Sequence, residues 1–232
     1  MSKHIKILLV EDEKNVGSTL HERLQKDGFH ATLATTGTEA RLEISHNNFD
    51  LVILDVGLPD DSGFEIAKTL RQKRPLTAII FLTAFGSPED RIRGLELGAE
   101  DYVTKPFHLK ELFLRIKNAL RRAKQLTQNT LDYKSTKIGR ALIHLARFEI
   151  KTDKKILPLT HKECALLKLL ITKKGKVVSR DEILNEVWGD NEFPTTRTVD
   201  NFIMRIRRMI EIDPEKPQII RSVRGVGYQL YV

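Results

Sequence analysis

The sequence predicts an α/β protein in two parts: a doubly wound, five-stranded parallel sheet, followed by a smaller α+β domain. Short apolar runs alternate with amphipathic helical patterns in the first half, which predicts the sheet. A hairpin pattern, three helical patterns and a glycine-rich C-terminal pattern predict the second part. At 232 residues the chain is long enough for two domains that each bury a core.

Four strand patterns of the first half run directly into polar side chains. Glu11 and Asp12 follow the run that ends at Val10, Asp55 follows Leu51–Leu54, Thr83 follows the run that ends at Leu82, and Lys105 follows Tyr102–Thr104. Because the carboxyl ends of parallel strands meet at one sheet edge, we expect these side chains to gather there.

Helical patterns separate these strands. Val16, Leu20 and Leu24 mark a helix that stops at Gly28. The spacing from Thr36 to Glu39 is that of a capping box. An N-cap, a proline and two acids over 87–90 predict the start of a further helix.

The gathered groups suit phosphoryl chemistry. Glu11, Asp12 and Asp55 would repel one another unless a divalent cation neutralised them, and an all-oxygen set with room for water suits Mg²⁺. Lys105 would pair with a phosphoryl group, the Thr83 hydroxyl would donate to it, and Asp55 would accept it as an acyl phosphate. Each feature alone is more often a helix cap, a solvated acid or a turn. Their joint occurrence at successive strand ends favours the functional interpretation.

The runs Leu8–Glu13, Leu54–Pro59, Leu82–Ala84 and Gly98–Phe107 resemble the receiver domain of bacterial response regulators, over residues 1–122. The resemblance implies a flavodoxin-like fold, Asp55 as phosphoacceptor, and Thr83 and Lys105 as its catalytic partners. It also implies Mg²⁺ ligands from Glu11, Asp12, Asp55 and the Gly57 carbonyl, a switch made of Thr83 and Tyr102, and a cis bond before Pro106. Gly57 stands where relatives commonly carry Met, which bears on the lifetime of the phosphorylated state.

Charge and composition separate the two halves. Before Gln125 there are 19 Lys and Arg against 18 Asp and Glu, and afterwards 20 against 13, so a polyanion partner is expected for the second half. The helical periodicity fades near Arg121, which predicts a polar linker over 123–131 and a second domain over 132–232. The single cysteine, Cys164, excludes an intramolecular disulfide and is expected to be a core residue.

The second half reads as a winged helix-turn-helix domain. Strand patterns around Asp153 predict a hairpin, and capping signals at Thr160 and Ser179 open two helices. A third helix, from Thr196 to about Glu211, carries an apolar stripe opposite a polar stripe of Arg197, Asn201, Arg205 and Arg208. Two C-terminal strands joined by 224–227 complete a wing. A basic stripe can be a plain solvated face, but this combination favours a DNA-reading helix.

The runs Leu159–Glu163, Val177–Arg180, Val187–Gly189, Arg197–Asp200 and Arg221–Tyr228 resemble the OmpR/PhoB-type effector domain. The resemblance implies DNA contacts from the third helix and the wing: Arg197, Thr198, Asn201, Arg205, Arg207, Arg208, Ser222 and Arg224. It also implies that residues 189–195 touch RNA polymerase. Asn201, Phe202 and Met204 depart from the family pattern, so base preference is left open.

The sequence thus predicts a phosphorylation-activated transcriptional regulator that takes its phosphoryl group from a sensor histidine kinase. Phosphorylation is expected to promote a homodimer through a charged receiver face made of Arg91, Glu96, Glu100, Asp101, Lys110 and Arg115, although these charges also suit a solvated surface. With no signal peptide or membrane-spanning run, a cytoplasmic protein is expected.

Two alternatives remain at this stage. A phosphatase that attacks through a strand-end Asp would need a second acid two residues later, where the chain has Gly57. We therefore expect no enzyme activity beyond transfer to Asp55 and hydrolysis of the acyl phosphate. A DNA-binding regulator whose receiver no longer responds to phosphate is the second alternative, and the complete set of acids disfavours it.

Overall fold

A computed structural model describes residues 4–84, 88–131, 133–189 and 195–231. The chain divides into two compact units, Met1–Arg122 and Ala123–Val232, each with its own core. The predicted helix cap at Ser87 lies outside the described residues, and so do residues 190–194 of the predicted RNA polymerase contact.

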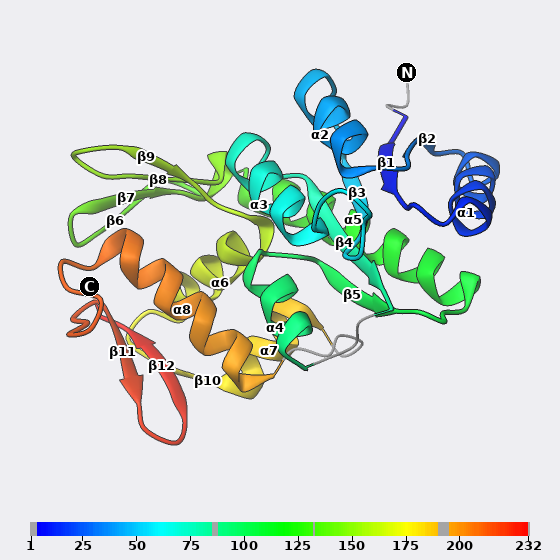
Figure 1. Ribbon diagram of the computed structural model, residues 1–232. Helices are drawn as coiled ribbons and strands as arrows, with labels where there is room; N and C mark the ends of the chain where they lie inside the picture. The colour runs from blue at the N-terminus through cyan, green and yellow to red at the C-terminus, as the bar shows by residue number, and fades with distance from the viewer. Residues whose placement is uncertain (1–3, 85–87, 132, 190–194, 232) are drawn as a thin grey trace. The chain divides into compact units, whose positions relative to one another are not determined.

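The first unit alternates strands and helices along the chain (Figure 1). Its elements are β1 (Lys6–Val10), α1 (Lys14–Lys26), β2 (His30–Ala34), α2 (Gly37–His46), β3 (Leu51–Asp55), α3 (Gly63–Lys73), β4 (Ala78–Thr83), α4 (Pro88–Glu96), β5 (Asp101–Thr104) and α5 (Leu109–Thr130). All the strand pairs are parallel, in the order β2-β1-β3-β4-β5. The predicted doubly wound five-stranded sheet is confirmed.

The sheet is covered on both faces. Every residue of the central strands β3 and β4 is buried, as expected for parallel strands between two helical layers. The local signals also hold: α1 ends before Gly28, whose φ of 86° suits glycine, and the Thr36 side chain accepts from the Glu39 amide. This framework carries the polar residues to the carboxyl edge of the sheet.

The predicted linker over 123–131 is wrong, because α5 continues through Thr130. Leu126 packs against the core of the second unit, and Thr130 is fully buried with its hydroxyl donating to the Leu126 carbonyl. Gln, Thr and Asn weaken the amphipathic pattern without breaking a helix, and packing supplies what the local sequence lacks.

The second unit contains two antiparallel sheets and a helical core. Its elements are β6 (Thr136–Ile138), β7 (Ala141–His144), a 3₁₀ turn (Leu145–Arg147), β8 (Glu149–Lys151), β9 (Ile156–Pro158), α6 (His161–Thr172), β10 (Val177–Ser179), α7 (Arg180–Trp188), α8 (Thr196–Ile210), β11 (Ile220–Val223) and β12 (Gly227–Leu230). The sheets have the orders β6-β7-β8-β9 and β10-β12-β11. The winged-helix prediction is confirmed, whereas β6, β7 and β10 were not predicted.

Helix α8 is anchored by the predicted apolar stripe. Val199, Ile203, Ile206 and Ile210 are all buried, and Trp188 packs edge-on against Phe202 with ring centroids 5.1 Å apart. The capping box at Thr160 and Glu163 is present at the start of α6, and Cys164 is buried as expected. Burial raises the pKa of the Cys164 thiol to about 12, so it is a core residue without thiolate character.

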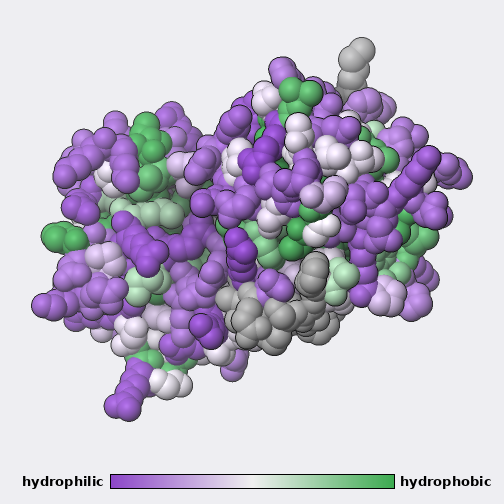
Figure 2. All heavy atoms as spheres, in the orientation of Figure 1, coloured by the Kyte–Doolittle hydropathy of each residue, from purple (hydrophilic) through white to green (hydrophobic). Residues whose placement is uncertain are grey.

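The visible surface is largely hydrophilic, and its apolar patches are small (Figure 2). Among the described residues, no helix combines the length and the apolar character needed to cross a membrane. Gly225, at the tip of the β11–β12 hairpin, has a φ of 73°, a conformation that a turn glycine adopts at little cost.

Candidate functional site

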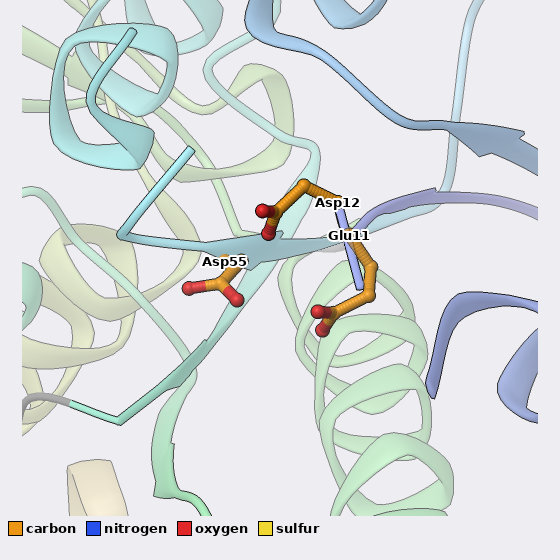
Figure 3. A group of neighbouring side chains, drawn as sticks. All are labelled: Glu11, Asp12 and Asp55. Carbon is orange, nitrogen blue, oxygen red and sulfur yellow. The ribbon is translucent and has the colours of Figure 1, made fainter. Parts of the chain in front are cut away.

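The predicted acids converge at the carboxyl edge of the parallel sheet. β1 and β3 are neighbours, and Glu11, Asp12 and Asp55 stand at their ends. Figure 3 shows the three carboxylates turned toward a shared space. One ligand oxygen from each lies within 4.8 Å of the others. Glu11 and Asp55 are buried, whereas Asp12 is exposed, so the group opens to solvent on one side.

Lys105 lies against this acidic group, directly after β5. Its ammonium donates hydrogen bonds to Asp55 Oδ2 at 2.6 Å, Glu11 Oε1 at 2.7 Å and Glu13 Oε1 at 3.0 Å. The Lys105–Pro106 bond is cis, as the resemblance implied. Burial alone would lower the pKa of Lys105, but the hydrogen bonds that it donates to Asp55 and Glu11 outweigh this effect and raise the pKa. The lysine therefore stays charged.

The buried Glu11 carboxylate fits a cation ligand. Burial raises its pKa, the neighbouring Asp55 charge acts in the same direction, and the hydrogen bond from Lys105 opposes both. Its Oε2 atom is buried and has no hydrogen-bond partner among the described residues. A buried carboxylate oxygen without a partner, beside two further carboxylates and an opening to solvent, matches the oxygen set and water access that Mg²⁺ prefers.

The segment after β3 holds the Asp55 carboxylate. The Gly57 amide donates to Asp55 Oδ1 at 2.9 Å, which leaves Oδ2 to Lys105. Gly57 and Ser62 form an antiparallel bridge that closes the segment. A Cβ on Gly63 would come within 2.2 Å of the Asp55 carbonyl, so only glycine fits where α3 begins against β3.

The two residues predicted to form the switch lie on the adjoining strands. Thr83, the last residue of β4, is fully buried. Tyr102 of β5 is 8% exposed, and its ring centroid lies 5.9 Å from that of Phe81. Gly94 of α4 packs closely against the Phe81 and Tyr102 rings. A Cβ at this position would lie only 3.0 Å from a carbon of each ring, so the close approach favours glycine. Tyr102 is therefore packed under α4 in this conformation.

The predicted dimer face is partly occupied by internal ion pairs. Arg115 of α5 pairs with Asp101 at 2.7 Å and with Glu111 at 2.8 Å. Burial would lower the pKa of Arg115, but the hydrogen bond to Asp101 outweighs it and raises the pKa. Asp101 and Glu100 are buried; exposed positions of the predicted set are Glu96 and Lys110. The side chain of Arg91 lies outside the described part of the chain.

In the second unit, α8 presents part of the predicted basic stripe. Arg197 and Arg208 are exposed, and Asn201 and Arg205 are partly exposed. The Arg205 guanidinium pairs with Glu163 at 2.8 Å and lies over the Phe202 ring. On the wing, the side chains of Ser222 and Arg224 are exposed. In Figure 2 the lower-left projection, where the β11–β12 hairpin lies in Figure 1, is hydrophilic at its tip.

Two residues predicted to touch DNA are buried instead. Thr198 is 1% exposed, and its hydroxyl accepts from the Thr195 amide at the start of α8. Arg207 is 7% exposed, and it donates to the Ile220 carbonyl and to Ser222 Oγ. The Thr198 side chain stabilises the start of α8, and the Arg207 side chain joins α8 to β11. In this conformation neither side chain can reach DNA, so we remove both from the candidate DNA contacts.

Sequence reasoning missed a network that joins α7, α8 and the wing. Asp200 Oδ1 accepts from the Tyr228 hydroxyl at 2.6 Å and from Arg180 Nε at 2.8 Å. The guanidinium groups of Arg180 and Arg207 lie 4.8 Å and 5.6 Å from the centre of the Tyr228 ring. Burial, together with the hydrogen bond to Asp200, raises the pKa of Tyr228 to about 12. The sequence signal that could have indicated this network is Asp200, an acidic residue within the otherwise basic helix α8.

Comparisons with known proteins cover both units. Residues 7–117 match the family model described as response regulator receiver domain, and residues 153–230 match transcriptional regulatory protein, C terminal. Sensory transduction protein RegX3 of Mycolicibacterium smegmatis is 37% identical over 224 residues, which cover 97% of this chain and 98% of the relative. RegX3 of Mycobacterium tuberculosis is 36% identical over 228 residues, with the same coverage.

The solved structures that match over the full length include the two that follow. A mutant of RitR has a TM-score of 0.77 at 27% identity. The response regulator DrrB, described as a Thermotoga maritima OmpR/PhoB homolog, has a TM-score of 0.50 at 36% identity. Each comparison covers 98% of this chain and 99% of the other.

Proposed function

Because this chain belongs to the OmpR/PhoB family of response regulators, we propose that a phosphoryl group on Asp55 controls how it binds promoter DNA. The family assignment makes it a transcription regulator of a two-component system, with phosphorylation-dependent activity and with DNA and a sensor kinase as partners. The observation that supports Asp55 most strongly is the convergence of Glu11, Asp12 and Lys105 around it at the sheet edge.

In the proposed reaction, a carboxylate oxygen of Asp55 attacks the phosphorus of a phosphohistidine on the kinase. The oxygen–phosphorus bond forms as the phosphorus–nitrogen bond breaks, and the histidine nitrogen leaves. Lys105, which donates to Asp55 Oδ2, is proposed to pair with a phosphoryl oxygen, and the Thr83 hydroxyl is proposed to donate to another. The Gly57 amide keeps Asp55 Oδ1 oriented.

Mg²⁺ is the proposed cofactor. Glu11, Asp12, Asp55 and the Gly57 carbonyl would hold it, and when bound it would offset the negative charge of the carboxylates and of the phosphoryl oxygens. The buried Glu11 oxygen that has no partner among the described residues supports this assignment.

The proposed DNA contacts are the accessible side chains of α8 and the wing, which are Arg197, Asn201, Arg205, Arg208, Ser222 and Arg224. A helix that buries one stripe and exposes arginines on the other can enter a major groove, and a hairpin with an arginine at its tip can reach an adjacent minor groove. The Arg205–Glu163 ion pair would have to open for Arg205 to reach DNA.

Phosphorylation is proposed to promote a homodimer on the α4–β5–α5 face. Thr83 moving toward the phosphoryl group would change the space around Tyr102 and α4, and so bias that face toward pairing. Arg115 and Asp101 would then exchange part of their internal ion pair for contacts to the partner. The loop between α7 and α8 is the proposed RNA polymerase contact, by family resemblance, although residues 190–194 lie outside the described part.

Labelling with acetyl phosphate or a phosphorylated kinase tests the nucleophile. Wild type should be labelled only in the presence of Mg²⁺, and Asp55→Asn should not be labelled. Asp27→Asn, which removes a surface carboxylate paired with Arg23 and Lys117, is the matched control and should be labelled normally. Undiminished labelling of Asp55→Asn would show that Asp55 is not the phosphoacceptor.

A further inference from the structure

The segment that follows Asp55, residues 56–62, is hydrogen-bonded through Asp60 to the start of α2. Asp60 Oδ1 accepts from the Gly37 amide at 2.7 Å, and Oδ2 accepts from the Thr38 amide at 3.0 Å and from the Thr38 hydroxyl at 2.8 Å. These amides are among those that a helix cannot satisfy internally. Three hydrogen bonds to one exposed carboxylate therefore join two segments that lie 22 to 23 residues apart in the sequence.

The next residue adds a second connection. Asp61 pairs with Arg41 of α2 at 2.6 Å, and the Arg41 guanidinium also donates to Thr69 of α3 at 2.6 Å. The approach is close: a Cβ on Gly37 would lie 2.4 Å from Asp61 Cβ. The sequence therefore uses a glycine at the first position of α2, where the two segments meet.

Three residues before Asp60 lies a backbone position that has no side-chain packing of its own. Gly57 is exposed and has no side chain to pack, and glycine has more backbone freedom than any other residue. Its amide nevertheless holds the Asp55 carboxylate at 2.9 Å. The segment closes through the Gly57–Ser62 bridge and the bond from the Gly63 amide to the Val56 carbonyl. Leu58 anchors the segment in the core, and the Val56 amide donates to the Leu82 carbonyl at 3.3 Å. The contact with α2 adds polar connections at the exposed residues that follow.

We propose that Asp60 is a positioning residue for the phosphorylation site: by binding the N-terminus of α2, it holds the Gly57 peptide groups where they orient Asp55 and face the metal. This inference rests on the proposed function, in which the Gly57 carbonyl is a Mg²⁺ ligand. Asp60 acts through the backbone of the segment, since both of its oxygens are engaged by α2. Support of this kind around a metal ligand typically changes affinity by about 10- to 100-fold.

The experiment is a Mg²⁺ titration of the full chain by calorimetry, with hydrogen exchange of residues 56–62 measured in parallel. Asp60→Ala should bind Mg²⁺ about tenfold more weakly, and its segment should exchange faster. Labelling by acetyl phosphate should need more Mg²⁺ but reach the wild-type rate at saturation. The Mg²⁺ affinity of Asp60→Asn, which keeps an oxygen for the Gly37 amide, should lie between the affinities of wild type and Asp60→Ala. Gly37→Ala, which forces the same contact open from the α2 side, should resemble Asp60→Ala.

Thr36→Ala is the matched control, because the Thr36 hydroxyl accepts from the Glu39 amide and so caps the same end of α2 by a different hydrogen bond. It should leave Mg²⁺ affinity and the exchange of 56–62 near wild type. Wild-type Mg²⁺ affinity in Asp60→Ala, or an equal loss in Thr36→Ala, overturns the positioning role while the proposed function stands. Failure of the wild type itself to bind Mg²⁺ overturns both.

Discussion

Replacing Lys105 with Met should destabilise the first unit when Mg²⁺ is absent. The Lys105 ammonium lies 2.6 Å from Asp55 and 2.7 Å from Glu11, and the three side chains are 13%, 6% and 0% exposed. Removing one partner of a buried ion pair leaves the remaining charge uncompensated, which costs about 3–5 kcal/mol. We expect a loss near the lower end, about 3 kcal/mol, because Glu11 can take up a proton in response.

The loss should depend on pH in a defined direction. Burial already raises the pKa of Glu11 above its ordinary value of 4.5, and Lys105→Met removes the hydrogen bond that opposes this rise. A carboxyl group whose pKa is higher in the folded state stabilises the fold below its unfolded pKa, and that contribution is lost as the pH rises through the folded pKa. The variant should therefore approach wild type in acid and fall furthest behind at and above neutral pH.

Urea unfolding followed by far-ultraviolet circular dichroism, with and without Mg²⁺, measures this effect. Mg²⁺ at about 100 times its Kd should restore about 2.7 kcal/mol to the variant. Trp188 lies in the second unit, so its fluorescence transition should not move and serves as an internal reference. Lys14→Met removes the same charge from an exposed position and should leave the free energy of unfolding unchanged. Equal stability of Lys105→Met and wild type at neutral pH without Mg²⁺ would refute the reasoning.

Three further predictions concern the second unit and the switch. Arg205→Ala or Arg208→Ala should weaken operator binding by about 1–3 kcal/mol, and loss of a phosphate contact should lower the salt slope by about one; wild-type values in a salt titration would indicate a solvated face. Tyr228→Phe, which removes the hydroxyl bound to Asp200, should cost about 1–2 kcal/mol in urea unfolding. Because the Tyr228 pKa is raised to about 12, wild type should lose that advantage as the pH rises from 10 toward 12; a pH-independent difference would contradict this. A beryllofluoride mimic should promote dimers and tighten binding to paired half-sites in wild type, while Arg115→Ala should lose that gain yet still accept phosphate; gel filtration that finds no mimic-dependent dimer in wild type would argue against the switch.

The candidate site of the first unit could be predicted well, because its residues directly follow parallel strands and their position at the sheet edge depends only on the strands. A side chain placed directly after a parallel strand must lie at the carboxyl edge, whatever the details of packing. Asp55 and Lys105 are 50 residues apart, yet strand ends alone predicted that both would gather at this edge, and the structure places the two side chains 2.6 Å apart. No sequence pattern indicated the hydrogen bonds between Asp60 and the start of α2, because a contact between a loop and a helix end depends on the exact conformation of the loop.

The second unit was predicted less completely, because the direction of a side chain on α8 depends on what covers the helix. Arg207 and Arg208 are adjacent in sequence and equally basic, but Arg207 reaches the Ile220 carbonyl and is buried, whereas Arg208 is exposed. A long arginine can be drawn inward wherever the end of a strand offers a carbonyl, and periodicity does not show where that strand will lie. Short strands such as β6 and β10 have three residues each, too few for an alternating pattern to stand out.

The charges around Asp55 indicate what kind of signal phosphorylation can send. Glu11, Asp12, Asp55 and Lys105 carry a formal total of about −2 when all are ionised. An acyl phosphate adds about one further negative charge, and a bound Mg²⁺ adds two positive charges, so the loaded site is less negative than the empty one. Repulsion at the site therefore does not drive the change. In the proposed mechanism, what changes is which oxygens the Lys105 ammonium and the Thr83 hydroxyl reach. The signal would then travel as a shift in position, through β4 and β5 to the closely packed contact of Tyr102 with Gly94 in α4.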